Sequence, residues 1–201
     1  NSAESDKYGI LIIDVDDNTF EINSHILQDD RFADFDISPD GQFLFLCQER
    51  VEKITKLNLD TLQATTFTTD TNEWGIHKIE VGNNNELYCH RDPPTSGNTQ
   101  FYIYDGNTGS LINGPTGILR HGDIEYNNSN NKLYGGNSNT SWGNIYRYTN
   151  NNNNLSIEDL NQPFSNYPDP FVLLSDDEQK IFWENYQLDL DLNVIRNFDT
   201  N

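Results

Sequence analysis

Apolar and polar residues alternate along most of this chain in short runs, and the runs come in pairs joined by turns rich in Asp, Asn and Gly. Alternation with a period of two predicts β-strands with one buried face. No segment has a convincing 3.6-residue apolar period, so we expect almost no helix. Five of the pairs share one pattern, an alternating strand, a polar turn and a second strand: GILIIDVDDNTFEI, EKITKLNLDTLQATTF, TQFYIYDGNTGSLI, GNIYRYTNNNNNLSI and NYQLDLDLNVIRNF.

A regular step relates these five hairpins, which we call outer hairpins. Their turns align at steps of 44, 45, 44 and 42 residues when the following positions are placed in register: Asp16, Asp60, Asp105, Thr149 and Asp191. Four inner hairpins lie between them at steps of 44, 45 and 48 residues, and their first strands end at Ser38, Gly82, Asn127 and Ser175. Each repeat therefore holds four short antiparallel strands in about 44 residues, the size of one β-propeller blade.

The sequence thus predicts an all-β fold, a single β-propeller domain or propeller segment over residues 1–201. We expect an N-terminal half-blade at 8–27 and four complete blades at about 33–69, 77–114, 121–158 and 170–199. Five outer hairpins against four inner ones leave the ring incomplete. The chain is excised from a longer propeller, or forms a small five-membered ring, or is closed by partner chains. An open propeller would expose a strand edge and an apolar blade face.

Two motifs carry a resemblance to a known group. The stretch FDISPDGQFLFL at 35–46, followed by a Tyr-Asp-x-x-Thr-Gly hairpin within 102–109, resembles the YVTN-type and WD-repeat-like β-propeller superfamily. The chain lacks the Gly-His and Trp-Asp dipeptides of true WD repeats. The resemblance implies the fold and leaves the activity open, because such propellers include scaffolds, lectins, lactonases and quinoproteins.

Charge narrows the possible partners. The chain carries 32 acidic and 12 Lys or Arg residues, a formal net charge of −20. Such a surface repels nucleic acid and anionic lipid, and no apolar run is long enough for membrane insertion. No signal peptide is present, and the absence of Met suggests a processed or excised segment. Acidity of this size is typical of solvated, secreted proteins, so we expect an extracellular or cell-surface location; attraction of Ca²⁺ is the alternative.

The loops opposite the short turns are longer and chemically richer, and they predict a ligand-binding face for a carbohydrate or a protein. The candidates on this face are Trp74, His77, His90, Arg91, Arg120, His121, Trp142 and Tyr167. Each has a plainer interpretation: the Trp side chains could wedge between blades, the Arg side chains could pair with Asp, and the His side chains could be structural. The His spacing does not predict zinc.

A second set of candidates comes from the repeat itself. Asp36, Glu80 and Glu125 occupy the same position of successive inner strands, and Leu173 interrupts the series. Because innermost strands border the central channel, these acids could form a carboxylate ring that holds Ca²⁺, or they could simply face channel water. We expect no other cofactor.

Catalytic signatures such as a Gly-x-Ser-x-Gly elbow or a phosphate-cradling Gly loop are missing. The sequence therefore favours a binding or interaction module over an enzyme. The alternatives are a segment of a lactonase-like or glycosidase-like hydrolase, in one version Ca²⁺-dependent, and a purely structural scaffold.

Overall fold

The computed structural model describes residues 9–14, 21–26, 31–48, 51–69, 75–91, 97–120, 122–137, 143–162 and 171–198. These residues form strands, turns and bends. They contain no helix, and therefore no helix long enough to cross a membrane.

The strands form one hairpin and four sheets of four antiparallel strands. The hairpin consists of β1 (Ile10–Asp14) and β2 (Glu21–Ile26). Blade 1 consists of β3 (Asp34–Ile37), β4 (Phe43–Cys47), β5 (Lys53–Asn58) and β6 (Ala64–Thr68). Blade 2 consists of β7 (Lys78–Val81), β8 (Glu86–His90), β9 (Thr99–Asp105) and β10 (Leu111–Leu119). Blade 3 consists of β11 (Asp123–Asn127), β12 (Lys132–Gly136), β13 (Ile145–Asn151) and β14 (Asn154–Asn161). Blade 4 consists of β15 (Val172–Leu174), β16 (Ile181–Trp183), β17 (Tyr186–Leu188) and β18 (Val194–Asn197).

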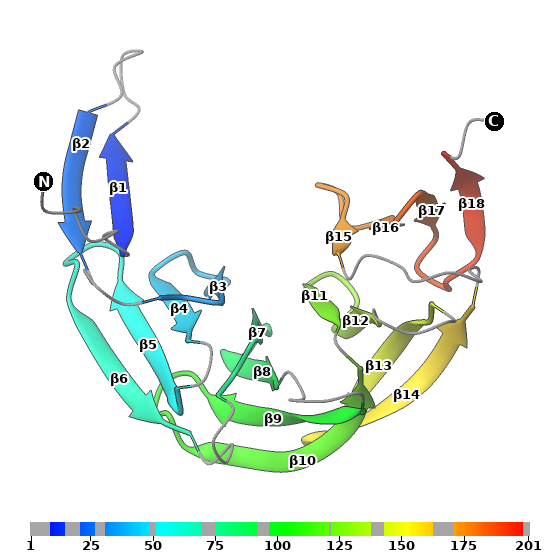
Figure 1. Ribbon diagram of the computed structural model, residues 1–201, viewed down its shortest axis with the longest axis horizontal. Coiled ribbons are helices and arrows are strands. Elements are labelled where there is room, and N and C mark those ends of the chain that lie inside the picture. The colour runs from blue at the N-terminus through cyan, green and yellow to red at the C-terminus, as the bar shows by residue number, and fades with distance from the viewer. Residues whose placement is uncertain are drawn as a thin grey trace, which may run out of the picture.

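The four blades follow one another around an arc (Figure 1). Within each blade the strands are hydrogen-bonded in chain order, and the first strands β3, β7, β11 and β15 lie toward the centre of the arc. The β1–β2 hairpin stands at one end of the arc and blade 4 at the other, with an opening between them. This arrangement confirms the predicted all-β propeller fold, and the sheets do not close into a ring.

Alternation along each strand gives every blade two apolar faces. We call the face toward the next blade in the chain the forward face, and the face toward the preceding blade the rear face. In β4, Phe45 and Cys47 point forward into the core shared with blade 2, whereas Leu44 and Leu46 point to the rear. Further clusters fill the spaces between blades 2 and 3 and between blades 3 and 4. The core is therefore a series of layers between blades.

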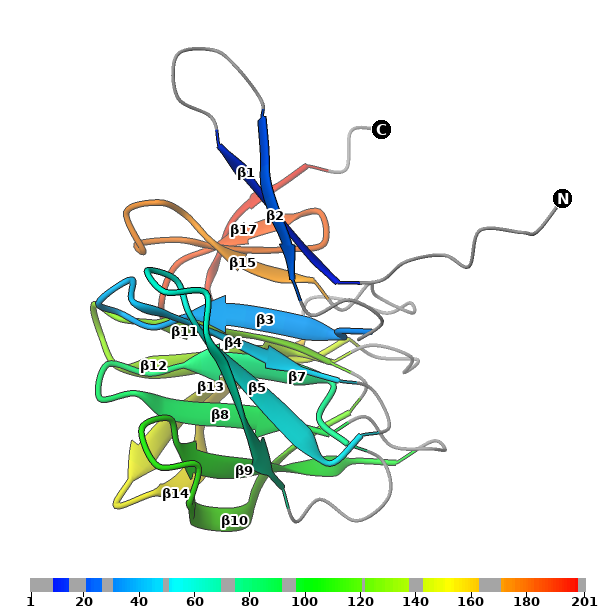
Figure 2. The same cartoon turned by 90° about the vertical axis from the view of Figure 1, so that its left-hand side faces the viewer.

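The turns between the first two strands of each blade gather at one side of the molecule (Figure 2). In blade 1 the Ser38 hydroxyl donates to Asp40 (2.6 Å), and the Gly41 N–H donates to the Ser38 carbonyl (2.8 Å). Gly41 has a φ of 72°, a value that favours glycine. Blade 4 repeats the contact between Ser175 and Asp177, also at 2.6 Å. The Ser-Pro-Asp-Gly motif is thus a self-contained turn that fixes the strand register.

Candidate functional site

A row of carboxylates along the inner strands ties each blade to the next. Asp36 of β3 accepts a hydrogen bond from the Val81 N–H of β7 (2.7 Å), and Glu80 of β7 accepts one from the Tyr126 N–H of β11 (3.0 Å). Glu125 of β11 accepts a backbone N–H of β15. The repeat brings these three predicted side chains into one row, which we call the inner carboxylate row. Each member satisfies a backbone group that sheet hydrogen bonding leaves free.

A second row lies two residues earlier on the same strands and contains a cation. Asp34 accepts the Ile79 N–H (3.1 Å) and Asp123 accepts the Val172 N–H (3.0 Å), so this level also links blade to blade. Lys78 stands between them, with its Nζ 2.7 Å from Asp123 and 4.0 Å from Asp34. Sequence reasoning missed this pairing, although the 44-residue step would have placed Lys78 in register with both acids.

The inner carboxylate row lines a cavity of about 260 Å³ near the centre of the arc. Burial raises the pKa of Glu80 well above 4.5, and repulsion from Asp36 and Glu125 raises it further. Burial, followed by repulsion from Asp123 and Asp36, raises the pKa of Glu125 to about 7. Burial and mutual repulsion therefore favour the protonated forms of these carboxyl groups in the folded protein.

Calcium binding by Asp36, Glu80 and Glu125 stays a prediction. Among the described residues, no three His, Cys, Asp or Glu side chains stand close enough together to hold a metal ion.

Four of the predicted ligand-binding residues gather at the loop end of blade 2. The His77 N–H donates to the His90 carbonyl (2.9 Å), and the Thr99 hydroxyl donates to the carbonyls of Arg91 and Leu119. Arg120 follows directly after β10. His77, Arg91 and Arg120 are half-buried and reach this surface.

His90 lies beneath this surface, in line with the structural alternative stated for the His side chains. Its side chain is fully buried, with Nε2 2.8 Å from the Thr99 hydroxyl and the ring 5.0 Å from that of Phe101. The reason is its place at the end of β8, a strand whose side chains from Leu87 to His90 are all buried between neighbouring blades. His90 therefore packs beneath the loop end of blade 2, where it contacts Thr99 and Phe101. Trp74, His121, Trp142 and Tyr167 lie outside the described residues.

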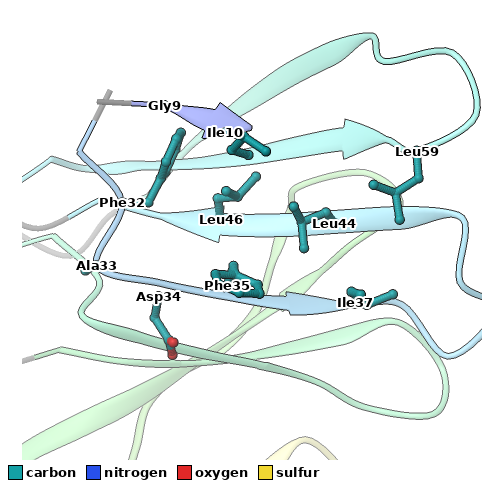
Figure 3. A pocket seen from close by; sticks show the side chains of 10 residues that line it. All are labelled: Gly9, Ile10, Phe32, Ala33, Asp34, Phe35, Ile37, Leu44, Leu46 and Leu59. Atoms are coloured by element: carbon teal, nitrogen blue, oxygen red, sulfur yellow. The ribbon is translucent and has the colours of Figure 1, made fainter. Parts of the chain in front are cut away.

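An apolar groove lies at the rear face of blade 1, beside the β1–β2 hairpin (Figure 3). We call it the end groove; its volume is about 540 Å³, and its lining residues are Gly9, Ile10, Phe32, Ala33, Asp34, Phe35, Ile37, Leu44, Leu46 and Leu59. In Figure 3, Phe35 and Ile37 lie along one wall, and Asp34 points away from them. Phe35 is 62% exposed and Ile37 is 48% exposed.

The equivalent positions of the other inner strands are covered. Ile79 of β7 and Ile124 of β11 are buried against the preceding blade, as Phe35 would be if a complete blade preceded it. The end groove is thus the part of the rear face of blade 1 that the β1–β2 hairpin borders, through Gly9 and Ile10, but leaves uncovered at Phe35 and Ile37. Sequence reasoning expected an exposed blade face in an open propeller but named no residue for it.

Four antiparallel four-stranded sheets around a shared inner row define a β-propeller-type fold, present here as an open arc. No family model matches the chain, and no curated protein matches it. Solved structures do match, at 10 to 15% sequence identity, which supports the fold alone. The finer resemblance to the YVTN-type group therefore stays a prediction.

Three of the similar structures illustrate the likeness. A structure described as a candidate 6-phosphogluconolactonase from Bacteroides uniformis matches 96% of this chain with a TM-score of 0.67 and 13% identity. Hydrazine synthase from Kuenenia stuttgartiensis matches 83% (TM-score 0.63, 15% identity), and a chain of the mitotic checkpoint complex matches 85% (0.60, 10%). This chain spans 64%, 48% and 51% of those chains, respectively.

Proposed function

We propose that this chain is a protein-binding module that uses its propeller arc as a rigid support and its end groove as the binding surface. The observation that carries the proposal is the exposure of Phe35 and Ile37 (62% and 48%) in a groove of about 540 Å³. Contiguous exposed apolar surface of this kind marks interaction sites in soluble proteins. A rigid sheet face also loses little entropy on binding.

The chemistry of the groove favours a protein partner. Its lining is almost entirely aliphatic and aromatic, so a sugar would leave its hydroxyl groups unpaired there. The net charge of −20 disfavours nucleic acid and anionic lipid. One matched structure is a chain of a multiprotein assembly, the mitotic checkpoint complex, which is consistent with protein binding. We place the module outside the cell or at its surface, on the ground that strong acidity suits solvation there.

The loop end of blade 2 offers a second, smaller contact for a carbohydrate or an acidic partner. Arg91 and Arg120 supply positive charge to this edge of an acidic chain. We propose that these two residues tune which partner binds, while the end groove supplies the affinity.

A hydrolase function has one observation in its favour. Glu125, with a pKa of about 7, lines the inner cavity and could act as a general base. Among the residues that the structure describes, the lining of that cavity includes Asp36, Glu80, Asp176 and Glu178 and no Lys or Arg. Such a cavity repels phosphorylated or otherwise anionic substrates, so a hydrolase of this design would act on an uncharged one.

Site-specific photocrosslinking tests the proposal. A benzoyl-phenylalanine placed at Phe35 should form a defined adduct with a protein in the native extract. The same probe at Ile157, which is 40% exposed on the outer strand β14, is the matched control and should form none. The adduct partner is then purified, and its binding should be lost in Phe35→Asp and kept in Ile157→Asp.

Two outcomes contradict the proposal. Adducts that form with a probe at Arg120 but not at Phe35 would move the binding surface to the loop end. Binding on a glycan array that is lost in Arg91→Ala/Arg120→Ala and kept in Phe35→Asp would replace the protein partner with a carbohydrate.

A further inference from the structure

The forward face of blade 4 departs from the pattern of the other three blades. In every blade, the residue at the position of the inner carboxylate row pairs with an aromatic residue of the second strand. These pairs are Asp36 with Phe45, Glu80 with Tyr88, Glu125 with Tyr134, and Leu173 with Phe182. Blade 4 therefore carries Leu173 where the other blades carry a carboxylate. Two residues earlier it carries Phe171 in place of Asp34, Lys78 or Asp123. Phe171 is 61% exposed and Leu173 is 57% exposed.

The arc consequently has an uncovered apolar surface at each end. The end groove, with Phe35 and Ile37, forms the rear end, and the forward face of blade 4, with Phe171 and Leu173, forms the other. Both pairs lie on inner strands, β3 in one case and β15 with the residue before it in the other. We call the packed interface between two consecutive blades a joint. At a joint, the positions equivalent to these two pairs lie on opposite sides and face each other.

The hydrogen bonds at the two ends match as well. At an internal joint, the row carboxylate of one blade accepts an N–H from the inner strand of the next. At the rear end, the Ile37 N–H already donates to Asp36 (2.7 Å), and the carboxylate of Asp34 accepts the Phe35 N–H. The rear end therefore needs no carboxylate from a partner, and the forward face of blade 4 offers none at these positions. An apolar face against an apolar face leaves no buried polar group unsatisfied here.

We propose that the occupant of the end groove is a second copy of this chain, whose Phe171 and Leu173 cover Phe35 and Ile37. The proposal rests on the proposed function, because it names the partner of the same groove. Two arcs related by a half-turn bring the forward end of each onto the rear end of the other. The ring so formed has two equivalent joints.

Because each copy carries a net charge of −20, the copies repel each other at low salt, and added salt should strengthen the pairing.

Sedimentation velocity of the purified 201-residue chain, at low and high salt, tests the proposal. The wild-type chain should sediment as a dimer, more completely at high salt. Phe35→Asp and Leu173→Asp should each weaken the dimer at least about 100-fold, because each buries a charge in both joints. Ile157→Asp, an apolar-to-charged change at an exposed position of β14, is the matched control and should remain dimeric.

Mixing the two monomeric variants is the decisive step. In an equimolar mixture of Phe35→Asp and Leu173→Asp, the mixed pair has one intact joint, where Leu173 of the first variant meets Phe35 of the second. Both substitutions fall in its other joint. The mixture should therefore recover part of the dimer, held by the intact joint. Circular dichroism of each variant confirms that its sheets are retained. If Phe35→Asp fails to fold, Ile37→Ser replaces it in both experiments.

Each contrary result overturns a defined part of the inference. A wild-type chain that stays monomeric at both salt concentrations excludes the second copy, and the crosslinking experiment then still decides whether another protein binds the groove. A dimer that survives Leu173→Asp but not Phe35→Asp would pair groove with groove. A mixture that dimerises no better than either variant alone counts against the head-to-tail arrangement, because only the mixed pair contains a joint without a substitution. Open-ended polymers exclude the closed ring.

Discussion

The substitution Glu125→Gln should stabilise the fold at neutral and alkaline pH while leaving its stability at acid pH nearly unchanged. Glu125 lies in the inner carboxylate row, where burial and the charges of Asp123 and Asp36 raise its pKa. A raised pKa means that the folded state holds the protonated form more tightly than the unfolded chain does. The contribution of this proton to stability is therefore complete below about pH 4.5 and is lost as pH rises through about 7.

The size of the effect follows from the pKa. A rise from 4.5 to about 7 corresponds to about 3 kcal/mol, because each pKa unit is worth about 1.4 kcal/mol. Ionised Glu125 therefore costs the folded state up to about 3 kcal/mol above pH 7. Glutamine carries no charge, and its side-chain oxygen can still accept the backbone N–H of β15. The variant should recover most of this cost.

Urea unfolding at several pH values between 4 and 8 measures the effect as the difference in the free energy of unfolding. The wild-type chain should lose stability from acid to alkaline pH, and Glu125→Gln should lose about 3 kcal/mol less. Asp60→Asn, in an exposed turn outside the inner carboxylate row, is the control for a change from acid to amide.

A parallel pair of curves for the wild-type chain and Glu125→Gln would refute the reasoning. It would mean that water reaches Glu125 well enough for this side chain to ionise in the folded state without cost. Glu125 would then affect stability only through its hydrogen bond to β15. A variant less stable at every pH would indicate that the glutamine amide cannot replace the carboxylate as acceptor.

Four further substitutions test the packing of the blades, all by urea unfolding at neutral pH. Lys78→Met removes the cation from between two carboxylates and should cost about 3 to 5 kcal/mol. Gly109→Ala should cost clearly more than Gly41→Ala: both have a φ above 70°, but a Cβ at Gly109 would stand 2.5 Å from the Phe67 ring, whereas nothing lies within 4 Å at Gly41. Trp183→Ala empties a fully buried position between blades 3 and 4 and should cost about 3 to 5 kcal/mol.

The blades could be predicted from the sequence because the information is local. Alternation specifies the strands, and turns such as Ser-Pro-Asp-Gly specify the reversals, so each hairpin follows from about fifteen neighbouring residues. The inner carboxylate row followed from the 44-residue step alone. Its chemistry did not follow, because the partners of Asp36 and Glu80 are backbone N–H groups of the next blade, and a backbone group leaves no mark in the sequence.

The end groove was harder to foresee for a different reason. Phe35 and Ile37 occupy the same alternating positions as Ile79 and Val81, and all four predict a buried face. Whether such a face is covered depends on what precedes the blade in space, and local pattern says nothing about that. The available signal was Leu173, the residue that interrupts the carboxylate series at the other end of the arc.

That interruption fits a joint that forms between separate molecules. At an internal joint the next blade is always near, so a carboxylate such as Glu80 exchanges water for a backbone N–H once, during folding. At the end of the arc, a carboxylate at position 173 would be hydrated in the free chain and would lose that water each time a partner docked. Leucine avoids this cost and gains from its own burial. The residue that ends the row therefore favours association, where a fourth acid would oppose it.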